Sequence, residues 1–229
     1  MTKLSEHLEE HKEEYKPWLE DGLQGRIDLK VLPYLNDIEN GVFVEAGALD
    51  GLFMSNTKIL EDLGWTGILV EPSKKAAEKC QKNRKSLVAN CALVSKDFKE
   101  EKVYGDFFFD GVDGMGAWSG IHKNLYGLKA VTWALARTLD SLLIDKGIKK
   151  VDFLSLDVEG YELEVLKGID FSTEITYILV EVNLKDYRLE TMDGYLKQFG
   201  YKNLGCLSGF TKELEGWDGS HADYLYAKS

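Results

Sequence analysis

The sequence has few of the features that mark disulfide-rich, zinc-binding, disordered or membrane-spanning proteins. Its three cysteines, Cys80, Cys91 and Cys206, are widely spaced and form no Cys-x-x-Cys pair, which argues against a zinc knuckle and a disulfide framework. Only three prolines and 44% hydrophobic residues indicate a folded chain. The sequence has no apolar leader and no run of about 18 apolar residues, so we expect a soluble, cytoplasmic protein without a membrane span.

Basic residues are scarce relative to acidic ones. The chain has 28 Lys and Arg against 39 Asp and Glu, a formal net charge of −11. Affinity for nucleic acid comes largely from Lys and Arg that neutralise phosphates, so we expect no nucleic-acid partner. The acidity itself indicates solubility rather than a particular chemistry.

The length of 229 residues fits one large α/β domain with a single active site. We assign this domain to residues 41–229 and treat residues 1–40 as an N-terminal helical segment packed on or near it. Residues 3–20 are rich in charge, with apolar side chains one or two helical turns apart, which predicts an amphipathic helix. Plain packing is the favoured interpretation of this helix, with a lid over a cofactor or an oligomer contact as alternatives.

Short apolar runs rich in β-branched residues alternate with helix-like stretches from residue 41 onward. This alternation is typical of a parallel sheet covered by helices on both faces. The predicted strands are Val42–Ala46, Gly67–Glu71, Leu87–Leu93, Phe153–Asp157 and Tyr177–Val182, then Tyr201–Leu207 and Asp223–Ala227 as a closing antiparallel pair. The predicted helices are Ser55–Leu63, Lys74–Lys82, Thr138–Lys146, Tyr161–Lys167 and Lys185–Phe199. The sequence therefore predicts a doubly wound, mostly parallel, seven-stranded α/β sheet with its ligand site at the carboxyl ends of the strands.

Residues 97–120 mix aromatic residues with glycines and are harder to assign. We predict a strand through Val103–Phe109 and a mobile, substrate-side loop over residues 105–125.

Carboxylates stand at the ends of four predicted strands. Glu45, Glu71, Asp157 and Glu181 each lie at or near the end of an otherwise apolar run. Because a buried carboxylate is costly without a partner, four such positions favour a ligand site over packing.

The turn after the first strand, Glu45-Ala-Gly47-Ala-Leu-Asp50-Gly51, combines glycines with acids. Glycine has no Cβ and tolerates positive φ, so backbone can approach a ligand closely here. A dinucleotide-binding turn would read GxGxxG, and an acid beside a pyrophosphate would be repulsive. Carboxylates suit the cationic amino and sulfonium groups of S-adenosylmethionine instead, and a tight turn without a ligand is the alternative.

The residues at two further strand ends are also typical of a site for a nucleotide-like cofactor. Glu71 ends the second strand, where a carboxylate in dinucleotide folds accepts both ribose hydroxyls. Asn90 and Cys91 stand at the third predicted strand and would shape an adenine pocket, although strand packing explains them equally well. Agreement between independent features favours a cofactor site over a plain turn.

The second half of the chain contains Arg137-Thr-Leu-Asp-Ser-Leu-Leu and Asp157-Val-Glu159-Gly-Tyr-Glu162-Leu-Glu-Val-Leu-Lys-Gly168. Together with the Glu-x-Gly-x-x-x-Gly turn, Ser55-Asn-Thr and Gly64-Trp-Thr-Gly-Ile-Leu-Val-Glu-Pro, the sequence resembles the FkbM-type methyltransferase family over roughly residues 40–227. The resemblance implies a class I methyltransferase fold and methyl transfer, usually to a hydroxyl oxygen of a natural product or sugar. One departure is Leu49, which stands where such proteins often have asparagine.

The motifs and the resemblance together define a set of predicted cofactor-binding residues. They are Glu45, Gly47, Asp50, Gly51, Ser55, Asn56, Glu71, Pro72, Asn90, Cys91 and Asp157.

Methyl transfer to an alcohol needs in-line positioning and a base for the hydroxyl proton. In one mechanism Asp157 or Glu159 orients the acceptor while His221 takes the proton, because an ordinary histidine pKa of about 6.5 suits that work. A surface position is the alternative for this lone loop histidine.

A second mechanism places Mg²⁺ between Asp157 and Glu181, with Asn183 or Glu159 completing the oxygen ligands. Against it, the segment from Glu159 to Glu162 would instead cap the following helix.

Three aromatic residues could stack on a sugar: Tyr161, Trp118 and Trp133. Core packing is the favoured interpretation for Trp133, and Trp118 is the better binding candidate.

The leading hypothesis is an S-adenosylmethionine-dependent O-methyltransferase that acts on a saccharide or glycosylated metabolite. A methyltransferase-like binding module without turnover and a nicotinamide-dependent oxidoreductase are the alternatives.

Overall fold

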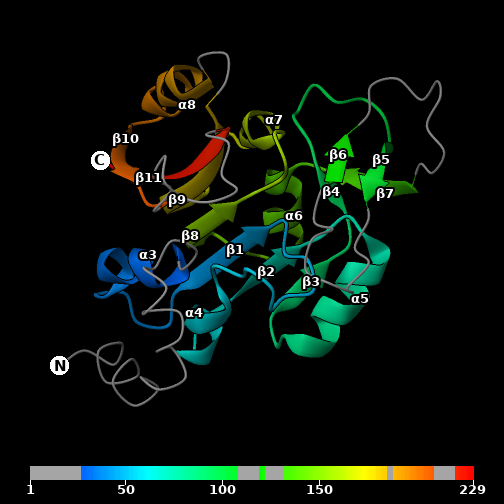
Figure 1. The fold of residues 1–229 in the computed structure, drawn as a ribbon, viewed down its shortest axis with the longest axis horizontal. Coiled ribbons are helices and arrows are strands. Elements are labelled where there is room, and N and C mark those ends of the chain that lie inside the picture. Colours follow the sequence, from blue (N-terminus) through cyan, green and yellow to red (C-terminus); the bar gives the residue numbers. More distant parts are fainter. Residues whose placement is uncertain (1–26, 108–118, 122–131, 185–187, 209–219) are drawn as a thin grey trace.

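A seven-stranded sheet forms the centre of the protein in the computed structural model, which describes residues 27–107, 119–121, 132–184, 188–208 and 220–229 (Figure 1). The strand order across the sheet is β10-β11-β9-β8-β1-β2-β3. These strands are β1 (Val42–Ala46), β2 (Thr66–Val70), β3 (Leu87–Ala89), β8 (Lys150–Leu156), β9 (Glu174–Asn183), β10 (Tyr201–Cys206) and β11 (His221–Lys228).

The strand directions confirm the predicted fold class. The five strands from β9 to β3 pair in parallel. Strand β11 pairs antiparallel with both β10 and β9, so it enters the sheet between them. This is a doubly wound α/β sheet whose five parallel strands bring their carboxyl ends to one edge.

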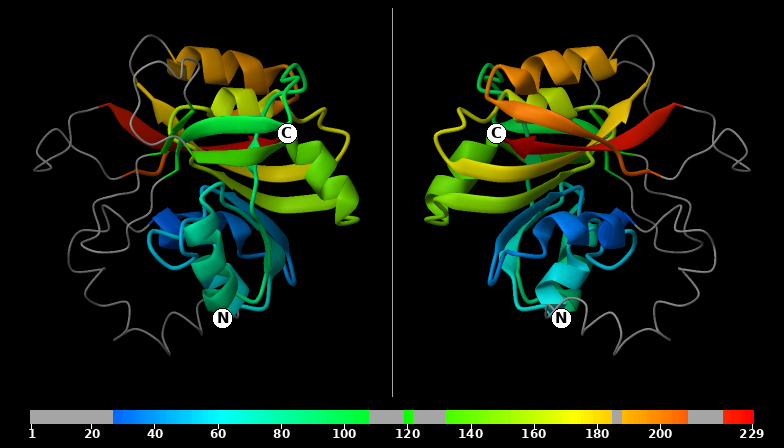
Figure 2. Two further views of the ribbon diagram at one scale, coloured as in Figure 1. Left: turned by 90° about the vertical axis from the view of Figure 1, so that its right-hand side faces the viewer. Right: turned by 90° about the vertical axis from the view of Figure 1, so that its left-hand side faces the viewer.

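Helices cover both faces of the sheet (Figure 2). One face carries α3 (Ile27–Leu35), α4 (Lys58–Asp62) and α5 (Lys74–Asn83), and the other carries α6 (Leu139–Asp145), α7 (Glu162–Leu166) and α8 (Arg188–Lys197). Alternate residues of each strand point to opposite faces, so Phe43 and Phe153 pack under the first group of helices, whereas Val44 and Leu154 pack under the second.

A second, four-stranded sheet of order β4-β7-β5-β6 lies beside the main one. Its strands are β4 (Ala92–Leu93), β5 (Lys102–Phe107), β6 (Ser119–Ile121) and β7 (Thr132–Arg137). The predicted single strand Leu87–Leu93 is therefore wrong, because the chain leaves the main sheet after Ala89 and enters the second at Ala92. The Asn90 side chain, which donates to the carbonyls of Glu71 and Pro72, holds the backbone in this turn.

The first predicted helix, Ser55–Leu63, begins later than expected. Helix α4 starts at Lys58 because the Ser55 and Thr57 hydroxyls and the Asn56 amide all donate to the Glu45 carboxylate. These hydrogen bonds to the Glu45 side chain hold residues 55–57 in a non-helical conformation, so they do not form the first turn of α4.

The predicted helix over residues 3–20, most of the predicted loop 105–125 and Trp118 lie outside the described residues. Helix α3 falls within the segment 1–40 and buries Val31, Leu32 and Leu35 in the same cluster as Phe43. No helix of the described ranges is long and apolar enough to cross a membrane.

Candidate active site

Gly47 is the point where the ends of three strands meet. A Cβ at this position would lie 1.8 Å from the carbonyl oxygen of Asp157, and φ is +87°. The amides of Gly47 and Ala48 both donate to the carbonyl of Val70, at 3.0 and 3.2 Å. Only glycine fits between the ends of β1, β2 and β8, and the backbone there is left without a side chain over it.

Glu71, directly after β2, is bonded to the turn after β1. Its carboxylate accepts the amide of Leu49 at 2.9 Å and the amide of Ser73 at 2.7 Å. Leu49 has φ of +48°, a conformation that leucine rarely adopts, and its amide reaches Glu71 from there. Burial raises the pKa of Glu71 to about 7, against the two amides that lower it. Each carboxylate oxygen keeps a further lone pair, so Glu71 can still accept a hydroxyl.

Glu45 is buried at the end of β1, and its oxygens are already used within the protein. They accept from the hydroxyls of Ser55 (2.8 Å) and Thr57 (2.6 Å) and from the amide of Asn56 (2.7 Å). The guanidinium of Arg84 lies 3.5 Å away. This carboxylate was expected to bind a cationic cofactor group, whereas in the structure it binds the loop that follows β1.

Asp50 and Gly51 shape the same loop. The Asp50 carboxylate accepts the amides of Leu52 (3.0 Å) and Phe53 (2.9 Å), so it closes a local turn. Gly51 has φ of +82°, and a Cβ there would lie 2.6 Å from the side chain of Arg84. Both residues therefore have a conformational role in this structure.

The end of β3 lies beside Glu71. The Asn90 side-chain amide donates to the carbonyls of Glu71 (2.8 Å) and Pro72 (3.0 Å). Cys91 is buried, and burial raises the pKa of its thiol to about 11, which keeps it uncharged. The structure thus joins Asn90 to Glu71 and Pro72, whereas Cys91 lies in the hydrophobic core.

Three neighbouring strands each place a carboxylate at the same height along the sheet, one residue beyond the pair Leu156–Val180. Asp157 follows β8 one residue beyond the pair Leu156–Val180, and Glu181 stands at that level on β9. Asp223 on β11 pairs directly with Glu181. Strand register therefore sets three acids side by side, and Gly47 lies next to Asp157 at the same level.

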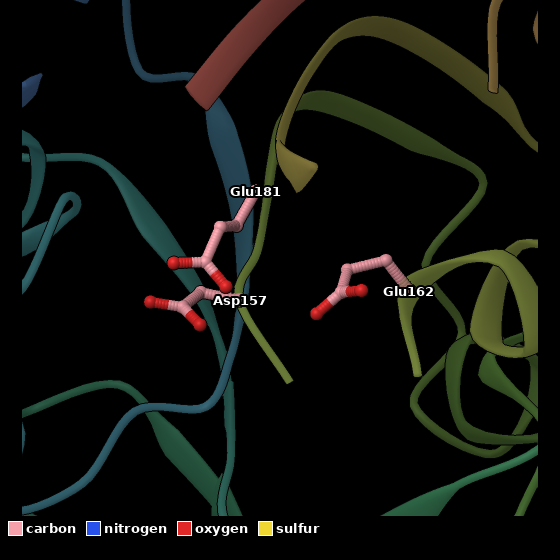
Figure 3. A group of neighbouring side chains, drawn as sticks. All are labelled: Asp157, Glu162 and Glu181. Atoms are coloured by element: carbon pink, nitrogen blue, oxygen red, sulfur yellow. The ribbon is translucent and has the colours of Figure 1, made fainter. Parts of the chain in front are cut away.

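Glu162, the first residue of α7, faces this row (Figure 3). One carboxylate oxygen each of Asp157, Glu162 and Glu181 lies within 4.8 Å of the others. Glu162 also accepts the amides of Val158 (3.1 Å) and Gly160 (2.8 Å) and so fixes the turn before α7, whereas the N-cap residue of α7, Tyr161, makes no side-chain cap hydrogen bond. We call Asp157, Glu159, Glu162, Glu181 and Asp223 the acidic cluster.

Members of the acidic cluster hold their protons unusually well. Burial and the neighbouring charges of Glu159, Asp223 and Glu162 raise the pKa of Asp157 well above its ordinary value. Burial and Asp157 raise the pKa of Glu181 to about 9, and burial and Glu162 raise the pKa of Glu159 to about 7. Like charges in a partly dry site disfavour the ionised form, so the cluster can take up and release protons near neutral pH.

This combination of a glycine turn, a strand-end acid beside it and an acidic cluster agrees with the comparisons to known proteins. The methyltransferase FkbM domain matches residues 45–202. The chain belongs to the FkbM methyltransferase family. No curated protein matches it.

Solved structures share the fold of this FkbM methyltransferase. A methylase from Haemophilus influenzae has 13% sequence identity and a TM-score of 0.50, and the match covers 90% of this chain and 98% of the other. The 1,6-didemethyltoxoflavin-N1-methyltransferase of Burkholderia thailandensis, solved with S-adenosylhomocysteine, has 11% identity and a TM-score of 0.47, with 98% and 86% covered. The family and the fold shared with the Haemophilus influenzae methylase support a class I methyltransferase that uses S-adenosylmethionine, and they give no support to Mg²⁺.

His221 lies at the start of β11, opposite Asn183 in the strand register. Its Nε2 is 3.8 Å from a Glu181 carboxylate oxygen, and its Nδ1 is 2.9 Å from the Ser220 hydroxyl. The structure therefore brings His221 to the edge of the acidic cluster, through Glu181. Glu162 takes the third place in the carboxylate group of this FkbM methyltransferase, where the sequence analysis expected Asn183 or Glu159.

The aromatic residues differ from expectation. Trp133 on β7 is 52% exposed, with the Lys102 ammonium 4.0 Å above its ring, so the core position expected for it is wrong. It faces solvent because Val103 and Ala134, which point the other way, form the buried side of the second sheet. Tyr161 is half-buried and packs against the core next to α7.

Sequence reasoning missed three residues of the site. Glu162 was considered only as a helix cap, and Asp223 only as part of a closing strand. Arg84 lies 39 positions from Glu45, in a helix end without any motif. The alternation of Asp223 with Leu225, which is fully buried, is the one signal that points to an inward side chain.

Proposed function

We propose that the protein transfers the methyl group of S-adenosylmethionine to a hydroxyl oxygen of a saccharide or glycosylated metabolite. The observation that carries this proposal is the row of carboxylates on neighbouring strand ends, which begins at Asp157, against the backbone of Gly47. Such a row offers negative charge to a cationic donor and a proton acceptor to an alcohol.

The described residues fit the donor. Glu71, with lone pairs beyond its two amide contacts, would accept the ribose hydroxyls, and Asn90 and Cys91 would border the adenine. Asp157, next to Gly47, is the carboxylate that would face the amino and sulfonium groups, since Glu45 already has its partners. When bound, S-adenosylmethionine supplies an electrophilic methyl carbon, and the sulfur–carbon bond breaks as the oxygen–carbon bond forms.

The hydroxyl proton must leave during this step, and Glu159 is our choice of general base. The residue is partly exposed, and its pKa, raised to about 7 by partial burial of the carboxyl and by Glu162, matches the operating pH of most enzymes. Glu181, whose pKa is raised to about 9 by burial and Asp157, already holds a proton near neutral pH, so the partly exposed Glu159 would pass its proton to solvent. His221 lies beside Glu181. The products of the transfer step itself are the methyl ether, S-adenosylhomocysteine and the protonated carboxyl group of Glu159.

Two features support a polar, uncharged or cationic acceptor. The acidic cluster repels a polyanion, and the chain as a whole carries a formal charge of −11. The family resemblance adds natural products and sugars as the acceptor class. A saccharide hydroxyl meets both conditions.

A metal-assisted form of the same reaction is favoured by one observation, the carboxylate group Asp157, Glu162 and Glu181. Three hard oxygen ligands suit Mg²⁺, which would lower the pKa of a bound hydroxyl. A chelator separates the two forms, because the carboxylate base requires no metal. Full activity after dialysis against EDTA supports Glu159 as the base, whereas loss that Mg²⁺ restores supports the metal.

The first experiment is isothermal titration of the protein with S-adenosylmethionine and with S-adenosylhomocysteine. The second is a screen of free sugars, sugar nucleotides and glycosides, with mass detection of the gain of one methyl group. The expected result is binding of both cofactor forms and methylation of one acceptor class. Binding without turnover on any acceptor favours a binding module, and the absence of binding by either form contradicts the proposed function.

A further inference from the structure

The loop from Gly51 to Thr57 is held from behind by one buried arginine. Arg84 caps the end of α5, and its side chain is 0% exposed. Its Nη1 donates to the carbonyl of Gly51 and to the Ser55 hydroxyl, both at 3.0 Å, and its Nη2 donates to the Thr57 hydroxyl at 3.0 Å. A guanidinium has five N–H donors in a rigid fork, so it can hold several acceptors of a folded loop at once.

Two carboxylates balance the charge of Arg84. Glu45 lies 3.5 Å from Nη1, and Glu61 on α4 accepts from Nε at 3.1 Å. Glu61 also accepts the amides of Ser86 and Lys85, which fixes the chain around Arg84 itself. Arg84 therefore joins β1, the loop, α4 and the end of α5, and a buried ion pair of this kind is costly to break from one side.

Gly51 provides the space for this arrangement. A Cβ at Gly51 would lie 2.6 Å from the Arg84 Cγ and 2.8 Å from the Cys80 Sγ. The second glycine of the turn is thus needed to admit Arg84, and the first, Gly47, to admit the end of β8.

The Gly51–Thr57 loop is also hydrogen-bonded to β8, the strand that ends just before Asp157. The Asn56 side chain donates to the Ser155 hydroxyl at 3.1 Å, two residues before Asp157. The loop is thereby fixed between Arg84 behind it and β8 in front.

We propose that Arg84 is a positioning residue for the methyl donor: it holds the Gly51–Thr57 loop in its binding shape, and Glu45 is its counter-charge rather than a ligand of the donor. This inference rests on the proposed use of S-adenosylmethionine. A loop ordered in advance binds a ligand more tightly, because its conformational entropy is already lost before binding.

The test compares Arg84→Lys and Arg84→Met with the wild type in titrations of S-adenosylmethionine and S-adenosylhomocysteine. Lysine keeps the charge but cannot reach all the acceptors of the fork. Both ligands should bind about 10- to 100-fold more weakly, by the same factor, as for other supporting partners of a binding site. Because Arg84 does not touch the reacting atoms, kcat at saturating donor should stay close to that of the wild type.

Hydrogen exchange gives a second readout that does not depend on activity. The Asn56 amide, which donates to Glu45, should exchange faster in Arg84→Lys than in the wild type. Lys58→Met is the matched control, since it removes the exposed ion pair with Asp62 on α4 and leaves the loop contacts intact. It should change neither donor affinity nor Asn56 exchange.

Each result has a defined meaning. Wild-type affinity for both ligands in folded Arg84→Lys overturns the proposal. A loss confined to the cationic S-adenosylmethionine also overturns it, since Glu45 would then act on the donor's charge. If Arg84→Met does not fold, Arg84→Lys decides alone. If the wild type binds neither ligand, the proposed function fails, and Asn56 exchange still reports whether Arg84 orders the loop.

Discussion

The acids of the site fall into two regions with opposite surroundings. Glu45 and Glu71 lie on the side of the glycine turn, and backbone amides, hydroxyls or a guanidinium donate to their oxygens. Asp157 and Glu181, one to three strands away, face each other and the rest of the acidic cluster. The difference shows how the same residue type can be used for structure in one region and for proton chemistry in the next.

The physical cause is the number of donors around each carboxylate. A buried carboxylate with several donors is stabilised in place and fixes a loop. A carboxylate among other carboxylates instead gains affinity for protons and cations, which is the property that a catalytic site needs. Five variants would break or sharpen this comparison.

Gly47→Ala should have the largest effect, because Gly47 lies between the glycine-turn side of the site and the acidic cluster. The added Cβ would lie 1.8 Å from the Asp157 carbonyl, and φ is +87°. We expect a loss of about 3 kcal/mol or more in unfolding free energy, measured with urea, together with loss of donor binding. Gly64→Ala is the control: φ is +93° and no atom lies within 4 Å, so about 1–2 kcal/mol is expected. Equal costs would contradict the contact argument.

Asp157→Asn should lower kcat/KM by about 10²- to 10⁴-fold, because it replaces a carboxyl that can ionise beside the cationic donor with an amide that cannot. It should also weaken S-adenosylmethionine more than the neutral S-adenosylhomocysteine. Asp152→Asn, on the same strand, is the control: Asp152 accepts the Val42 amide and pairs with Lys150, so stability should fall and activity should not. Full activity of Asp157→Asn would show that the catalytic centre does not lie at Asp157.

Glu71 and Glu159 allow a direct comparison by pH, because burial raises the pKa of each to about 7. Both must be ionised to act, so donor affinity and the rate at saturating donor should each fall up to about tenfold per pH unit below 7. Glu71→Gln should remove the pH dependence of donor affinity, measured by titration. Glu159→Gln should remove that of the rate, measured in a single turnover. If one of these variants removed the pH dependence of both donor affinity and rate, the two regions would not have separate functions.

Glu181→Gln should have the smallest effect, and it acts on stability. Burial and Asp157 raise the pKa of Glu181 from 4.5 to about 9, so the folded state holds a proton that the unfolded chain has released. The wild type therefore loses stability as pH rises from about 4.5 to 9. A glutamine cannot ionise, so the variant should be more stable than the wild type at pH 9 by about 1–2 kcal/mol in urea unfolding. Glu174→Gln, exposed on the same strand, should show no such gain.

Most of the sheet could be predicted from the sequence, because a short apolar run rich in β-branched residues is a local property. The apolar run Val42–Ala46 and the final antiparallel pair were both recognisable, and the structure confirms them. The break between β3 and β4 was not, since it depends on Asn90 reaching two carbonyls of another segment. Trp133 was assigned to the core because its neighbours are apolar, but the register of β7 turns it outward.

The sequence by itself determined where acids stand along the chain: Glu45, Glu71, Asp157 and Glu181 all follow apolar strands. Only the tertiary structure decided which of them are surrounded mainly by donors and which mainly by other carboxylates. The register of β11 with β9 places Asp223 beside Glu181. The position of Arg84 at the end of α5 places its guanidinium beside Glu45. A carboxylate's proton affinity depends on what surrounds it within a few ångströms, and those neighbours come from parts of the chain that sequence spacing does not connect.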